Sequence, residues 1–129
     1  MIVVDSSVWI DYFNGVPSPE ADRLDALAGV EPLAIGDLIL TEVLQGFRSD
    51  SDFDRARTAL LTLTVYPMLG TQMALRCAEN YRYLRRRGLT VRKTADVIIA
   101  TFCVEHGHRL LFSDRDFLPF VEHFGLERA

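Results

Sequence analysis

Short apolar runs alternate with long amphipathic stretches along the whole chain, and this alternation limits the folds that are open to it. Each run reads as a strand that is buried on both faces, whereas the stretches between the runs carry apolar residues at three- and four-residue spacing. Strands that alternate with helices predict a parallel sheet with helices on both faces. The predicted strands are Met1–Val4, Leu33–Asp37, Leu63–Tyr66 and Arg109–Phe112, with an edge strand around Phe124–Leu126.

The helices are predicted from the same spacing and from signals at their ends. Ser18 is a predicted N-cap with Pro19 at the first helical position, Thr94 is a second predicted N-cap, and Gly88 ends the longest helix. The predicted helices are Ser7–Phe13, Pro19–Ala28, Leu38–Phe47, Phe53–Leu61, Thr71–Arg87, residues 94–106 and Phe117–Glu122. Together these elements predict an α/β fold, a three-layer α/β/α sandwich around a mostly parallel five-stranded sheet.

Composition limits the setting more than the function. The chain has 129 residues and no linker-like stretch, so a single domain over residues 1–129 is expected. Hydrophobic residues make up 49%, but no apolar run is long enough to span a membrane and the N-terminus lacks the basic start of a signal peptide. We therefore expect a cytoplasmic protein. Cys77 and Cys103 lack a CxxC spacing and fall on apolar helix faces, which predicts buried free thiols.

Five acidic residues that are far apart in the sequence are predicted to meet at one edge of the sheet. Asp5 ends the first strand, and the hydroxyls of Ser6 and Ser7 after it are expected to cap the helix that follows. Glu42 lies in the first turns of the helix after the second strand. Asp96 begins the helix that leads into the last long strand, and Asp114 and Asp116 follow that strand directly. All of these positions lie at the carboxyl ends of parallel strands, where open α/β sheets bind their ligands.

Such a cluster needs compensating positive charge. Two carboxylates about 5 Å apart repel by roughly 3 kcal/mol at an effective dielectric constant of about 20, so protons or cations must neutralise the group. A ligand set made only of carboxylate oxygens favours Mg²⁺ or Mn²⁺ over zinc. Such ions can activate water and stabilise the leaving oxygen of a phosphodiester. The formal net charge of −4 does not argue against a nucleic-acid substrate, because 18 acidic residues minus these five leaves 13 against 14 basic ones.

With these residues identified, the chain resembles the PIN-domain nucleases, and in particular the VapC toxins of toxin–antitoxin pairs. The matching segments are Ile2–Ile10, Leu40–Val43, Thr94–Ala100 and Leu111–Phe117. The resemblance implies that Asp5, Glu42, Asp96 and Asp114 form the catalytic, metal-binding quartet, with Asp116 as a further ligand or a supporting carboxylate. It also implies that Ser6 and Ser113 orient an acid or a water.

The same resemblance implies an activity and partners. A Mg²⁺- or Mn²⁺-dependent endoribonuclease is expected, which would cleave transfer or ribosomal RNA, form homodimers and be neutralised by a VapB-type antitoxin. Arg92, Lys93 and Arg115 lie near the acids in sequence and are candidates for contacts with RNA phosphates. The run Arg85–Arg87 could also bind RNA, although basic residues in the last turn of a helix are favoured by its dipole alone.

Other functions remain open at this stage. A phosphoacceptor receiver domain or an aspartyl-phosphate phosphatase would also place acids at strand ends, but Ser6 and Ser7 occupy the positions where these proteins need a second acid. A non-catalytic PIN-like RNA-binding or scaffold domain is the other alternative. Its mark would be the loss of an acid, and all five are present.

Overall fold

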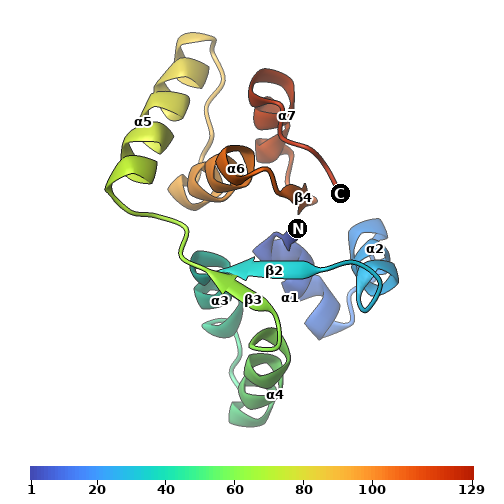
Figure 1. Cartoon of the computed structure of the whole chain (residues 1–129). Coiled ribbons are helices and arrows are strands. Elements are labelled where there is room, and N and C mark those ends of the chain that lie inside the picture. Colours follow the sequence, from blue (N-terminus) through green and yellow to red (C-terminus); the bar gives the residue numbers. More distant parts are fainter.

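A parallel sheet of four strands forms the centre of the protein, as seen in the computed structural model of residues 1–129 (Figure 1). The strands are β1 (Ile2–Val4), β2 (Leu33–Gly36), β3 (Thr64–Tyr66) and β4 (Arg109–Leu111), in the order β3-β2-β1-β4. Every neighbouring pair is parallel. Strands β1 and β2 are buried along their whole length, as their continuous apolar sequences predict.

Helices cover both faces of the sheet. They are α1 (Ser6–Asn14), α2 (Pro19–Leu27), α3 (Asp37–Leu44), α4 (Asp50–Leu60), α5 (Thr71–Arg86), α6 (Thr94–His106), the 3₁₀ turn η1 (Arg115–Phe117) and α7 (Leu118–Phe124). In Figure 1, α1, α3 and α4 lie on one side of β2, and α5, α6 and α7 lie on the other. The predicted three-layer α/β fold is therefore confirmed. None of the helices combines the length and the apolar character needed to span a bilayer.

The strand order places a topological switch point between β1 and β4. From β1 the chain moves through β2 to β3 on one side, and the connection through α5 and α6 then returns it to β4 on the other side of β1. Ligands of open α/β sheets bind beyond the carboxyl ends of the strands at such a point. In Figure 1 the arrowheads of β2 and β3 point to the side where α3 and the first turn of α6 lie, which marks this edge.

The predicted fifth strand around Phe124–Leu126 is wrong in its position. The helix α7 continues to Phe124, and Gly125 ends it with a φ of 71°, a left-handed conformation that glycine adopts without strain. Pairing with β4 begins only after this turn, where Arg128 forms an isolated parallel bridge to Leu110. A complete edge strand does not form, so the sheet has four strands.

A close contact at Gly36 ties the connection after β3 to the end of β2. A Cβ atom at Gly36 would lie 1.9 Å from Sδ of Met68, and Met68 is 1% exposed and cannot swing into solvent. Oδ1 of Asp37 also accepts a hydrogen bond from the backbone nitrogen of Met68 at 3.2 Å. These contacts hold the segment from which α5 starts.

We expect Gly36→Ala to lower the free energy of unfolding by about 2 kcal/mol, because the added methyl group overpacks this contact. Chemical denaturation measures the loss. In a Met68→Ala background the same substitution should cost much less, since the atoms that clash are gone. An equal cost in both backgrounds would show that the close contact is not the cause.

Candidate metal centre

Asp5 lies at the switch point between β1 and β4. It follows β1 directly, and its backbone nitrogen donates a hydrogen bond to the carbonyl oxygen of Leu111 in β4 at 2.9 Å. Its side chain is only 3% exposed, with Oδ2 accepting a hydrogen bond from Ser7 Oγ at 2.7 Å. Oδ1 is buried and has no hydrogen-bond partner in the protein. A buried carboxylate oxygen without a donor is costly unless a cation or a proton satisfies it.

Three further acids converge from α6 and from the segment after β4. Ligand oxygens of Asp96, Asp114 and Asp116 all lie within 4.8 Å of one another. Asp96, in the first turn of α6, is 6% exposed, and its Oδ2 is also buried without a partner. Asp114 Oδ1 accepts a hydrogen bond from the backbone nitrogen of Asp116 at 2.9 Å, so Asp114 caps η1 and its conformation is fixed. The other oxygen of Asp114 has no such bond to the turn.

Serine hydroxyls connect the remaining acid to this group. Glu42 is half-buried on α3, and its Oε1 accepts a hydrogen bond from Ser6 Oγ at 3.1 Å. Ser7 Oγ lies 3.3 Å from Ser113 Oγ, which links the start of α1 to the segment after β4. Helix α3 also packs against α6, which brings the helix of Glu42 to that of Asp96. Asp5 and Glu42 thus border the three-aspartate group.

The electrostatics of the site favour cation binding. Burial, followed by the charges of Asp5 and Asp114, raises the pKa of Asp96 from 3.8 to about 7. Burial also raises the pKa of Asp5, against the lowering effect of the Ser7 hydrogen bond. The pKa of Glu42 is raised in the same way, with Ser6 opposing the shift. The charges of Asp5, Asp114 and Glu42 all raise the pKa of Asp96, so a positive ion placed among these acids would be held strongly.

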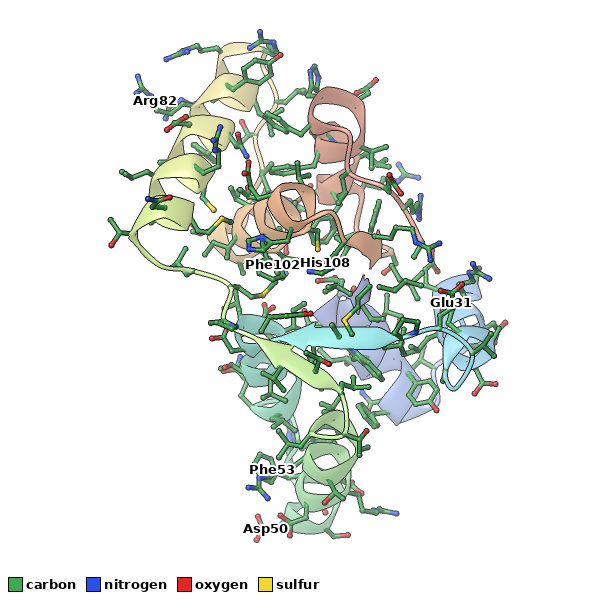
Figure 2. The ribbon with its side chains drawn as sticks, viewed as in Figure 1. Glu31, Asp50, Phe53, Arg82, Phe102 and His108 are labelled. Atoms are coloured by element: carbon green, nitrogen blue, oxygen red, sulfur yellow. The ribbon has the colours of Figure 1, made fainter.

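The residues fit a hard divalent cation. All the donors are carboxylate oxygens, which suits Mg²⁺ or Mn²⁺, and two buried oxygens lack any partner within the protein. Both cysteines are free and buried, as predicted, and neither is among the residues of the acidic group. The three histidines also lie elsewhere. His108 stacks on Phe102 (Figure 2), His106 stacks on the same ring, and His123 contacts Tyr83.

The three candidate RNA contacts have different surroundings. Arg92 is exposed, and its Nε lies 3.2 Å from Asp116 Oδ2. Lys93 is exposed directly before α6. Its positive charge partly opposes the rise that burial causes in the pKa of Glu42 and of Asp96. Arg115 is exposed in η1. Arg85 and Arg87 instead lie over the rings of Tyr81 and Tyr83.

Two details differ from the sequence-based predictions. The N-cap of α6 is Lys93, and Thr94 is the first helical residue. The hydroxyls of Ser6 and Ser7 were expected to cap α1, but they bind the acids instead. Ser7 therefore belongs to the site, although the sequence suggested only Ser6 and Ser113. Its position two residues after Asp5 was the one available signal, and it fits a helix cap equally well.

Comparisons with known proteins agree with this architecture. Residues 2–120 match the family model of the PIN domain. The chain is 33% identical over 122 residues to ribonuclease VapC11 of Mycobacterium tuberculosis. This alignment covers 91% of this chain and 89% of that protein. A VapC ribonuclease of Mycobacterium bovis matches to the same extent.

Solved structures show the same fold. VapBC2 of Rickettsia felis, in a complex with a DNA fragment from its promoter, aligns with a TM-score of 0.78 at 18% identity over 100% of this chain and 98% of that chain. VapC20 of Mycobacterium tuberculosis, described as a toxin that cleaves the sarcin–ricin loop, aligns with a TM-score of 0.73 at 18% identity over 100% of both chains. A toxin–antitoxin complex of Klebsiella pneumoniae aligns with a TM-score of 0.70 at 25% identity over 91% of this chain and 90% of that chain.

Proposed function

Since this chain belongs to the PIN-domain family and, within it, to the VapC ribonucleases, we propose that it is a toxin that hydrolyses RNA phosphodiester bonds with Mg²⁺ or Mn²⁺. The observation that carries the proposal is the convergence of Asp96, Asp114 and Asp116 beside the buried Asp5. Two of these acids have buried oxygens without a partner. All of them lie at the switch point of the sheet, where the fold binds ligands.

Each acidic residue has a distinct role in the proposed site. Asp5, Asp96 and Asp114 would hold a divalent cation, which lowers the pKa of a water and offsets the negative charge that develops on the phosphodiester. Asp116 would contribute a further oxygen. Glu42, which accepts a hydrogen bond from Ser6, would act as the general base that takes a proton from the attacking water. Ser7 and Ser113 would hold the Asp5 side chain in a fixed position relative to the segment after β4.

The comparisons also support a protein partner. The solved complexes with similar folds from Rickettsia felis and Klebsiella pneumoniae contain an antitoxin. We therefore propose that a VapB-type antitoxin binds this chain and restrains its nuclease activity, and that the chain assembles as a homodimer within that complex. A protein that cleaves RNA inside its own host needs such restraint.

The direct test is RNA cleavage by the purified chain, free of antitoxin. Total cellular RNA should be cut at a limited set of sites with Mg²⁺ or Mn²⁺, and EDTA should stop the cleavage. Sequencing of the new RNA ends would then show whether transfer or ribosomal RNA is the substrate. Intact RNA under all conditions, together with normal binding of the cation, would instead favour a non-catalytic RNA-binding domain.

Cation binding has its own expected result that does not depend on activity. Mn²⁺ should raise the melting temperature of the protein, by an amount that corresponds to about 2.7 kcal/mol when the ion is present at 100 times its dissociation constant. Asp96→Asn should remove most of this increase, because it takes away a ligand with a buried, unsatisfied oxygen. Thermal unfolding with increasing Mn²⁺ measures both proteins. Equal shifts for the two would contradict a cation site at Asp96.

A further inference from the structure

The connection between α5 and α6 places two positively charged side chains, those of Arg92 and Lys93, at the rim of the acidic group. Lys93 has an extended backbone, with φ −115° and ψ 126°, and neighbouring side chains in extended backbone point to opposite sides. Arg92 accordingly reaches Asp116, at 3.2 Å, whereas the charge of Lys93 acts on Glu42 and Asp96. The carbonyl oxygen of Lys93 accepts hydrogen bonds from the backbone nitrogens of Asp96 and Val97, so this residue is fixed to the start of α6.

Four other basic side chains bear on this comparison, and of these Arg115 is exposed in η1 and forms no ion pair. Arg128 donates to the carbonyl oxygen of Phe112 and lies over its ring, and Arg109 pairs with Glu31. Arg82 on α5 (Figure 2) lines a pocket together with Thr94 and Val97 in the first turn of α6. Lys93 has no carboxylate within ion-pair distance, and the partner of Arg92 is one of the acids of the site itself.

The ion pair between Arg92 and Asp116 has a consequence for binding. A cation that binds Asp116 competes with the guanidinium of Arg92 for the same carboxylate, so each weakens the other's hold. The arginine side chain is 76% exposed and its planar fork matches a phosphate. Once the carboxylate is neutralised by another ion, the guanidinium is free to bind an anion at the rim of the site.

We propose that Arg92 and Lys93 are the positioning residues for the scissile phosphate, and that Arg92 exchanges Asp116 for this phosphate when a divalent cation occupies the acidic group. The proposal rests on the nuclease function argued above. The positive side chains of Arg92 and Lys93, which flank the acids, would attract the phosphodiester to carboxylates that would otherwise repel it. Cation binding and RNA binding then strengthen each other through Arg92, and this coupling must be reciprocal.

The first test measures cation binding without RNA. Calorimetric titration with Mn²⁺ should show a dissociation constant about threefold lower for Arg92→Ala and for Lys93→Ala than for the wild type, because each substitution removes a competing or repelling charge. Arg57→Ala, which removes an exposed charge on α4, serves as the matched control and should leave the constant unchanged. Substitutions that merely disturbed the local structure would weaken cation binding instead.

The second test measures binding of a short single-stranded RNA of mixed sequence in a Glu42→Gln background, which removes the proposed proton acceptor and keeps all four aspartates. Arg92→Ala or Lys93→Ala should weaken RNA binding about tenfold and make the salt dependence shallower by about 0.7 in log–log slope for each charge removed. Lys93→Arg should restore the affinity. Mn²⁺ should strengthen RNA binding when Arg92 is present and do so much less in Arg92→Ala.

The outcomes separate this proposal from the nuclease function. If the wild type binds Mn²⁺ and cleaves RNA, but both variants bind RNA as well as Arg57→Ala does, the assignment of Arg92 and Lys93 is wrong and the nuclease function stands. Weaker Mn²⁺ binding in both variants would also overturn it. If the wild type neither binds Mn²⁺ nor cleaves RNA, the nuclease function itself fails, and the assignment fails with it.

Discussion

Asp5→Asn should reduce RNA cleavage by about a thousandfold or more while the protein stays folded. The asparagine keeps the shape of the side chain and can still accept the hydrogen bond from Ser7, but it lacks the charge that would hold a divalent cation. Asp5 is 3% exposed and directly follows β1, where its backbone nitrogen still pairs with Leu111 of β4. Initial rates of cleavage with saturating Mg²⁺ measure the loss.

The matched control is Asp54→Asn, which removes an exposed carboxylate from α4 and should cleave RNA at the wild-type rate. Circular dichroism and the melting temperature of Asp5→Asn show whether its fold is intact. A folded Asp5→Asn protein that retains most of the wild-type rate would rule out Asp5 as a metal ligand, and with it the proposed arrangement of the centre.

Asp96→Asn should stabilise the protein at alkaline pH when a chelator is present, by about 2 kcal/mol at about pH 8. The pKa of Asp96 is raised to about 7 in the folded protein, first by burial and then by the charges of Asp5 and Asp114. Its contribution to the free energy of unfolding is therefore complete below about pH 4, the region of its ordinary pKa, and is lost as the pH rises through 7. Above that pH the folded state must carry a buried charge that asparagine lacks.

Urea denaturation across this pH range, with EDTA, measures the effect. The wild type should lose stability between about pH 4 and pH 8, and Asp96→Asn should lose less. When Mn²⁺ replaces EDTA, the free energy of unfolding of the wild type at about pH 8 should return toward its value at low pH. Identical pH profiles for the two proteins would show that the folded state does not disfavour the ionised form of Asp96. That result would weaken the case for a cation among these acids.

The sequence predicts the fold well where local signals and long-range packing agree. The buried strand β1, the capped start of α2 at Ser18 and the end of α6 at Gly107 all follow from short patterns that the structure repeats. The misplaced edge strand shows the limit. Phe124 is apolar and suits either the end of a helix or the start of a strand, and in the structure α7 extends to Phe124 before Gly125 ends it.

The site is predictable in its acids but not in its polar contacts. Acids at strand ends converge because a parallel sheet brings those ends to one edge. The destinations of the Ser6 and Ser7 hydroxyls depend on partners up to 106 positions away, at Ser113, and local rules favour a helix cap instead. The pairing of Arg92 with Asp116 likewise depends on how the α5–α6 connection passes over η1, which no local pattern encodes.

The order in which the strands are synthesised governs when the nuclease can first act. Strand β1 is made first, yet its neighbour β4 and the acids that follow it come from the last quarter of the chain. During translation the emerging polypeptide therefore cannot assemble its centre until Asp116 has left the ribosome and the sheet has closed around β1. If the proposed nuclease needs this complete centre, it would stay inactive throughout its own synthesis, and the cell would have that interval in which to supply an inhibitor.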